Sequence, residues 1–261
     1  MIFHVGIPFK KLLEKRDIIE RGINPEIHFY WNELDKPNLG KAEELSGLLK
    51  EKKLSVTFHA PFIDVNIGSM DPLFQEATLK RFCSLTPFID IFSPEVIVIH
   101  AGYDPFRYDN RVDLWLEPAK RNMEVIIKAY EGSRIALENT SEWDPDPILK
   151  LIEEFSGEIF FCYDIAHAFV RGRVPLSLWL DALGDKTIEV HVSDNMGDFD
   201  DHLPPGEGLI DFRDMFRFFR NMGREPIYTL EVFKDDLLER ALKSFPKVYQ
   251  SAFQPLQEAQ V

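Results

Sequence analysis

The chain has 261 residues, 45% of them hydrophobic, and a formal net charge of −14 at pH 7. This charge repels nucleic acid over the surface as a whole, so nucleic acid is disfavoured as a partner, while a local basic groove remains compatible with it. No apolar run approaches the roughly 18 residues of a membrane span, and the N-terminal MIFHVGIPFKK has no export pattern, so we expect a cytoplasmic protein without a membrane partner.

Apolar segments of strand character alternate with segments of helical periodicity along the chain. We expect strands at residues 1–6, 26–31, 54–59, 95–100, 134–138, 159–164, 187–191 and 226–231. We expect helices at residues 9–21, 40–53, 72–92, 112–130, 146–156, 175–183, 211–222 and 233–250. Pro118 and Pro246 should kink or divide two of these helices. The alternation predicts one (β/α)8 TIM barrel domain over residues 1–261, with a frayed tail from about residue 252.

Six of the expected strands end on a side chain that can bind a metal ion. They are His59, His100, Glu138, Asp164, His191 and Glu231. The carboxyl ends of barrel strands meet at one rim, so these side chains should converge on one cation cluster. The pattern predicts a metalloenzyme.

Side chains alternate between the two faces of a strand, so the position of the strand-end residue predicts which earlier side chains face the barrel interior. The inward positions are mostly small or polar, but they include Glu189, for which the sequence offers no partner. Ile188 should face outward. Arg134 is a candidate partner for Glu138 if that carboxylate is structural. His4 and His28 are interpreted as packing residues.

Two histidines and three carboxylates near the later strand ends have alternative interpretations. Asp164 and His167 form D-x-x-H, which fits a metal pair or a helix-capping Asp beside a packed His. After the seventh strand comes a long loop, SDNMGDFDDHLPPGEGLIDF, of the kind that builds active sites in this fold. In it, Asp200 and His202 either bind a cation or belong to a solvated acidic loop. Glu207 is either a partner behind the ligands or a turn carboxylate.

Other side chains near the strand ends are candidates for substrate binding. His59 and His100 could donate hydrogen bonds to a substrate instead of binding a metal. Phe62 could act as an apolar wedge. The candidates for holding a phosphate are the arginines on the loops after the fourth and sixth strands, Arg107, Arg171 and Arg173.

Several of these motifs, in this order, resemble the xylose isomerase-like TIM barrel superfamily, which includes sugar phosphate isomerases and epimerases as well as endonuclease IV. The matching segments are H-A-P-F (59–62), I-H-A-G (99–102), L-E-N (137–139), D-I-A-H-A-F (164–169), H-V-S-D-N (191–195), H-L-P-P-G-E-G (202–208) and L-E-V (230–232). The resemblance spans residues 55–232.

The resemblance implies two ligand sets. Glu138, Asp164, His191 and Glu231 are similar to the single-metal set of ketose epimerases, in which the two glutamates act as acid and base and the position of His167 contacts substrate. The three-zinc site of endonuclease IV has counterparts for a larger set, His59, His100, Glu138, Asp164, His167, His191, Asp200, His202 and Glu231. The segment HAPFIDVNIGS is more similar to the isomerase version than to the DNA-inserting loop of the nuclease.

Three hypotheses about function follow. The first is a metal-dependent isomerase or epimerase that moves a proton next to the carbonyl of a small sugar or sugar phosphate, with Glu138 and Glu231 as catalytic residues. The second is zinc-dependent phosphodiester hydrolysis at abasic DNA. The third is a non-catalytic sugar-binding barrel. The ligand types suit one to three divalent ions, zinc or manganese first. The sequence leaves a homo-oligomer open.

Overall fold

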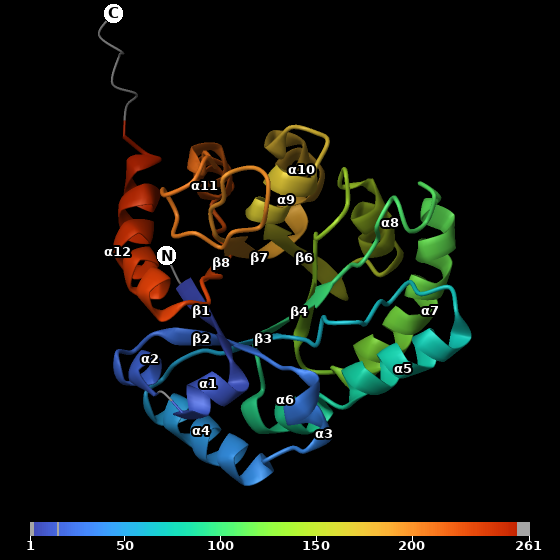
Figure 1. Cartoon of the computed structure of the whole chain (residues 1–261), viewed down its shortest axis with the longest axis horizontal. Helices are drawn as coiled ribbons and strands as arrows, with labels where there is room; N and C mark the ends of the chain where they lie inside the picture. The colour runs from blue at the N-terminus through green and yellow to red at the C-terminus, as the bar shows by residue number, and fades with distance from the viewer. Residues whose placement is uncertain (1–2, 15, 255–261) are drawn as a thin grey trace, which may run out of the picture.

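The computed structural model describes residues 3–14 and 16–254. The described strands form a closed parallel barrel in the order of the chain, and β1 pairs with β8 to close it. Figure 1 shows the helices arranged around this barrel. The strands are β1 (Phe3–Pro8), β2 (Asn24–His28), β3 (Thr57–His59), β4 (Val96–His100), β5 (Arg134–Glu138), β6 (Ile159–Asp164), β7 (Thr187–Val192) and β8 (Ile227–Leu230). The predicted (β/α)8 barrel is confirmed.

The helices depart from the expected pattern at several places. They are α1 (Phe9–Glu14), α2 (Asp17–Glu20), α3 (Trp31–Asp35), α4 (Leu39–Glu51), α5 (Pro72–Cys83), α6 (Thr86–Phe92), α7 (Val112–Ala129), α8 (Asp146–Glu154), α9 (Ile165–Arg171), α10 (Leu176–Leu183), α11 (Arg213–Asn221) and α12 (Asp235–Ser251). The segments 9–21 and 72–92, each expected to be one helix, hold two helices each. The short helices α3 and α9 were not predicted.

Two further features of the helical layer bear on the sequence analysis. Helices α7 and α12 run through Pro118 and Pro246 and are not divided there. The expected fraying from about residue 252 is wrong for the first two residues, because Ala252 is fully buried and the ring of Phe253 lies 5.1 Å from that of Tyr249. The rest of the expected tail, residues 255–261, lies outside the described residues. None of the described helices combines the length and apolar character that crossing a bilayer requires.

The apolar core has two parts. The larger one lies between barrel and helices and takes the outward side chains of the strands, such as Ile97, Leu137 and Tyr228. A smaller cluster takes inward side chains, including Val98 and Cys162, and fills the barrel below the strand ends. The smaller cluster also contains Ile188, which should face outward. The pairing of β6 with β7 shifts register between Phe161 and Cys162, so strict alternation fails there.

A segment after β3 is fixed against α7 by close packing. Gly68 leaves no room for a side chain, because a Cβ atom there would lie 1.9 Å from Cδ1 of the buried Trp115. The Trp115 indole donates a hydrogen bond from Nε1 to the carbonyl of Ala101 at 3.1 Å, so the ring cannot move without losing this bond. The segments that follow β3 and β4 are thereby held together at the barrel rim.

Gly68→Ala is expected to lower the free energy of unfolding by about 1–3 kcal/mol, because the added methyl overpacks the contact with Trp115. Denaturant unfolding followed by circular dichroism measures this. The matched control is Gly47→Ala on α4, where an added Cβ has no neighbour within 4 Å, and it should stabilise the helix by up to about 1 kcal/mol. Equal stability of Gly68→Ala and the wild type would contradict the packing argument.

Candidate metal centre

Four buried side chains from neighbouring strand ends meet at the carboxyl end of the barrel. Glu138, Asp164 and His191 lie on β5, β6 and β7, and Glu231 directly follows β8. One ligand atom from each lies within 4.8 Å of every other. These are the residues that the resemblance assigned to a single metal ion, and the fold brings them together from positions far apart in the chain.

His59 and His100 extend this group. With Glu138 they form a second set whose ligand atoms lie within 4.8 Å of one another. The Nε2 atoms of His59 and His100 lie 3.1 Å and 3.4 Å from Oε2 of Glu138. Glu138 can therefore belong to two cation sites at once.

Asp200, from the long loop after β7, lies between two histidine rings. Its Oδ2 is 3.1 Å from Nε2 of His167 and 3.0 Å from Nε2 of His202. Burial would lower the pKa of His202, but the hydrogen bond to Asp200 and nearby carboxylates raise it to about 9. In the described part of the chain, no group of mutually close donor atoms contains all three residues. The loop nevertheless brings Asp200 and His202 to His167.

Asp164 caps a helix, as one of the two alternatives proposed, and keeps one oxygen in the cluster. Its Oδ1 accepts a hydrogen bond from the backbone N–H of His167 at 2.7 Å, which caps α9. Its Oδ2 has no hydrogen-bond partner among the described residues and lies 3.9 Å from Nδ1 of His191. The Asn139 side chain donates to the backbone carbonyl of Asp164 at 2.7 Å and accepts from its backbone N–H at 2.9 Å, so the strand end is held rigidly. The side chain can cap the helix with one oxygen and bind a cation with the other.

The charges in the cluster are suited to a bound cation. Among the described ion pairs, those of Glu138, Asp164 and Glu231 involve only histidines. Arg134 is not the partner of Glu138, because it is exposed and bonded to Glu95 at 2.7 Å. Burial raises the pKa of Asp164 to about 7, although His167 opposes this rise. Buried carboxylates without Arg or Lys are costly.

Two potential metal-ligand atoms without a hydrogen-bond partner also fit a bound cation. Oε1 of Glu138 and Nδ1 of His191, both buried, have no hydrogen-bond partner in the described structure. His167 lies close to Glu138, but its Nδ1 bonds the carbonyl of Asn139 at 2.9 Å. Burial would raise the pKa of Glu138, but His100 and His191 hold it well below its ordinary value, which keeps it a carboxylate. Carboxylate and imidazole ligands suit a divalent ion such as zinc or manganese.

Two residues of β2 complete the site, and the sequence analysis missed the role of both. Glu26 is fully buried, with Oε1 2.9 Å from Nε2 of His28 and Oε2 3.3 Å from Nε2 of His191. Because Nε2 of His191 faces Glu26, its Nδ1 faces the cluster. Ligating histidines in proteins are commonly oriented by such a carboxylate.

His28 is more than the packing residue that we expected. Its ring stacks on that of His59 at 4.7 Å, and its Nε2 lies 3.9 Å from Oε1 of Glu231. Gly6 makes room for this ring, because a Cβ there would lie 2.8 Å from Nε2 of His28. The signal in the sequence was the two-residue spacing of Glu26 and His28, which places both side chains on the inward face.

The deeper carboxylate, Glu189, has partners that the sequence did not reveal. Its Oε1 accepts hydrogen bonds from the hydroxyls of Thr229 at 2.5 Å and Thr57 at 3.3 Å. Burial, and then the charge of Glu26, raise its pKa well above the ordinary value. His4 bonds the hydroxyls of Thr57 and Ser55, in agreement with a packing role.

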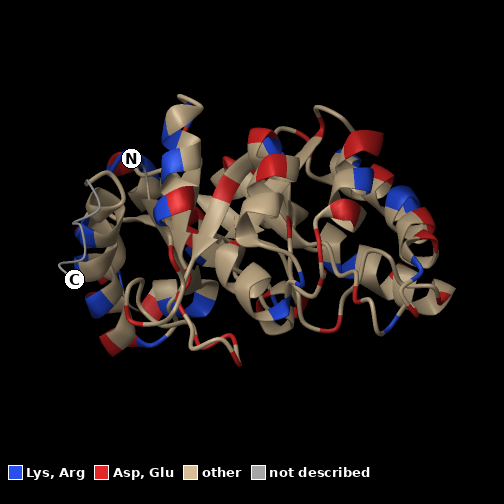
Figure 2. Cartoon of the chain, turned by 90° about the horizontal axis from the view of Figure 1, so that it is seen from above, with Lys and Arg blue, Asp and Glu red and all other residues tan. Residues whose placement is uncertain are grey.

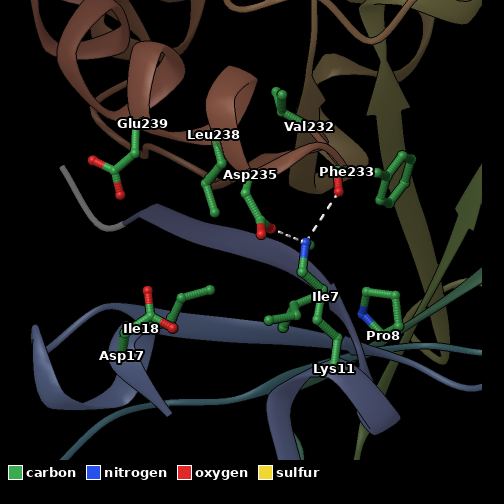
Figure 3. Close-up of a pocket in the computed structure, with 11 residues that line it drawn as sticks. Ile7, Pro8, Lys11, Asp17, Ile18, Val232, Phe233, Asp235, Leu238 and Glu239 are labelled. Atoms are coloured by element: carbon green, nitrogen blue, oxygen red, sulfur yellow. Dashed lines mark hydrogen bonds and ion pairs between the residues drawn. The ribbon is translucent and has the colours of Figure 1, made fainter. Parts of the chain in front are cut away.

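The segment that follows Glu231 is tied to the first helix. A small cavity of about 160 Å³ lies beside this segment, and Nζ of Lys11 there donates to the carbonyl of Phe233 at 3.1 Å and pairs with Asp235. Figure 3 shows these two contacts as dashed lines. The ring of Phe233 in turn lies 5.6 Å from that of His28 and 4.7 Å from that of His202. The contacts hold the chain just beyond Glu231 against two histidines of the site.

The candidate substrate-binding residues lie at different distances from the cluster. The Phe62 ring lies 5.1 Å from the rings of both His59 and His100, so it borders the site. Arg107 lines a groove that starts at Phe62. Arg171 is exposed in the last turn of α9.

Two further candidates are engaged elsewhere. The guanidinium of Arg173 stacks 3.2 Å from the ring centroid of Trp143. Glu207 is not brought into the cluster, because both of its oxygens bond Arg240 on α12. Its partner is therefore an arginine from a distant helix, which the sequence did not indicate.

The fold and the cluster define a (β/α)8 barrel protein with a candidate metal centre at the carboxyl ends of its strands. The chain belongs to the xylose isomerase-like TIM barrel family, whose profile matches residues 17–254. This agrees with the resemblance seen in the motifs.

Individual relatives are more distant. The uncharacterized protein MJ1311 of Methanocaldococcus jannaschii is 28% identical over 189 residues, which cover 69% of this chain and 64% of that protein, less than two thirds of its length. Fructoselysine 3-epimerase of Escherichia coli O157:H7 is 34% identical over 121 residues, covering 46% and 38% of the two chains. A D-tagatose 3-epimerase-like protein of known structure superposes with a TM-score of 0.79 at 23% identity, covering 97% and 98%.

Glu26→Gln is expected to weaken binding of zinc or manganese by about 10–100-fold, because His191 loses the carboxylate that orients its ring. Competition against a chromophoric chelator measures the affinity. Glu44→Gln is the control, since Glu44 pairs with Arg16 at the surface, and it should leave the affinity unchanged. Unchanged affinity in Glu26→Gln would show that Glu26 does not support the site.

Proposed function

We propose that the protein is a divalent-metal-dependent epimerase or isomerase that moves a proton next to the carbonyl of a small ketose. The observation that carries this proposal is the convergence of Glu138, Asp164, His191 and Glu231 within 4.8 Å, with two carboxylates suited to proton transfer. The similarity to fructoselysine 3-epimerase and to a D-tagatose 3-epimerase-like structure supports a sugar as the substrate.

Glu138, Asp164, His191 and Glu231 would hold the cation, which when bound supplies an electrophile for adjacent carbonyl and hydroxyl oxygens. Glu138 and Glu231 come from β5 and β8, strands that are not adjacent in the barrel. One carboxylate removes the proton from the carbon next to the carbonyl, and the other delivers a proton to that carbon. His167 would contact a substrate oxygen through Nε2 after Asp200 moves away, because Nε2 lies 3.1 Å from Oδ2 of Asp200 and Nδ1 bonds the carbonyl of Asn139.

The surroundings of the two glutamates favour this chemistry. Glu138 and Glu231 are 0% and 4% exposed, so water has little access to a proton held there. Phe62 covers the rings of His59 and His100, and Phe233 packs against His202 on the Glu231 side. The apolar rings strengthen electrostatic interactions at the reacting carbon by excluding solvent.

Glu231→Gln is expected to reduce exchange of the substrate proton with solvent by at least about 100-fold, because an amide cannot accept that proton. NMR of deuterium incorporation into D-tagatose by protein loaded with manganese measures the exchange, and metal content is determined on the same samples. The control is Glu239→Gln, an exposed residue paired with Arg21. Retained exchange in metal-loaded Glu231→Gln would remove this residue from the mechanism.

A second candidate is metal-dependent phosphodiester hydrolysis at abasic DNA. It is favoured by the donors beyond the four-residue set, namely His59 and His100 beside Glu138, and His167 and His202 on either side of Asp200. Such a set could hold more than one ion, as two-metal phosphodiester chemistry requires. The charge of −14 works against it, and Figure 2 shows Lys and Arg interspersed with Asp and Glu along the helices.

Elemental analysis of protein purified without chelator separates the two candidates. We expect close to one ion per chain for the epimerase, whereas about three ions would favour the hydrolase. In parallel, an abasic duplex at low salt should remain intact with the purified protein. Incision that a chelator abolishes would establish the nuclease in place of the epimerase.

A further inference from the structure

A groove adjoins the candidate metal centre on the side of Phe62. It has a volume of about 790 Å³ and lies between the segments that follow β3 and β4. Phe62 is common to both places, since its ring borders the groove and lies 5.1 Å from the rings of His59 and His100. A ligand bound at the strand ends could therefore extend past Phe62 into the groove.

The wall of this groove is held in place before any ligand binds. Tyr108 donates its hydroxyl hydrogen bond to the carbonyl of Gly68 at 3.0 Å, and Asn122 donates to that of Ile67 at 2.7 Å. Asn66 bonds the carbonyl of Gly102 at 2.8 Å and accepts from the N–H of Gly68 at 2.8 Å. A wall fixed in this way loses little conformational freedom on binding, as expected of a binding site.

The lining combines apolar surface with charges of both signs. Phe74 and Met70 are 63% and 53% exposed although both are large and apolar. Asp64, Asp71 and Arg107 also line the groove, and no ion pair involves any of them among the described residues. One oxygen of Asp71 accepts from the N–H of Leu73, which leaves the other for a ligand. With two carboxylates and one guanidinium, the lining carries more negative than positive charge, which disfavours a doubly charged phosphate.

We propose that this groove binds an amino-acid group carried by the sugar, so that the substrate is a ketose joined to an amino acid. This inference rests on the proposed function, which supplies the sugar at the strand ends. Arg107 takes the carboxylate in a two-pronged contact, Asp64 and Asp71 take the ammonium, and the aliphatic stem lies on Phe74. The groove's volume of about 790 Å³ is within the roughly 300–1,000 Å³ of small-molecule sites.

The test compares three probes with manganese-loaded protein: fructose joined to the ε-amino group of lysine, free fructose, and fructose 6-phosphate. The wild type should prefer the lysine conjugate over free fructose by at least about 100-fold in kcat/KM. Arg107→Ala should lower this preference about tenfold, chiefly through the KM of the conjugate. Arg111→Ala is the control, since Arg111 lies on the same segment but pairs with Asp113 outside the groove, and it should keep the preference.

Several results would overturn the inference. These are equal use of conjugate and free fructose by the wild type, a preference that Arg107→Ala leaves intact, or fructose 6-phosphate as the best probe. Turnover of none of the three probes would count against the proposed function instead. Calorimetry of the conjugate binding to both proteins then decides about the groove: about tenfold weaker binding by Arg107→Ala supports it, and equal or absent binding rejects it.

Discussion

The cost of burying carboxylates without basic side chains governs this molecule. Glu26, Glu138, Asp164 and Glu231 are buried inside the barrel, and their described ion pairs involve only histidines. The deeper Glu189 is also buried and bonds two threonine hydroxyls. An imidazole can offset such a charge only in part, and a divalent cation offsets it far more fully. The hydrogen bonds that fix the strand ends keep the donors facing each other despite their repulsion.

The fold and most of the candidate metal ligands could be predicted because a parallel barrel has a simple and recurring sequence pattern. Its strands are buried on both faces, so they read as short apolar runs, and each run stops where a polar side chain reaches the rim. His59, His100, Glu138 and Asp164 close their strands as expected, whereas β7 continues one residue past His191. Glu231 follows its strand by a single residue. The local sequence held this information because each ligand is part of a strand.

The missed features depend on contacts between distant segments or on strand boundaries. The second strand was expected to end at Trp31, but it ends at His28 and Trp31 begins α3, so the strand that ends on His28 was not recognised. The ion pair of Glu207 with Arg240 depends on where α12 packs, which no local pattern encodes. The inward place of Ile188 follows from a register shift between two strands that pair only in the folded barrel.

Gly6 makes β1 differ from the other strands at the rim, because it has no side chain there, and this difference could be used in engineering. Each strand from β2 to β8 supplies an acid or a histidine at or beside its end, whereas the described part of β1 contributes bare backbone at the level of Glu26. This vacancy accommodates the imidazole of His28. Enlarging residue 6 would push that imidazole aside and alter the coordination environment indirectly, without replacing any of the coordinating side chains themselves.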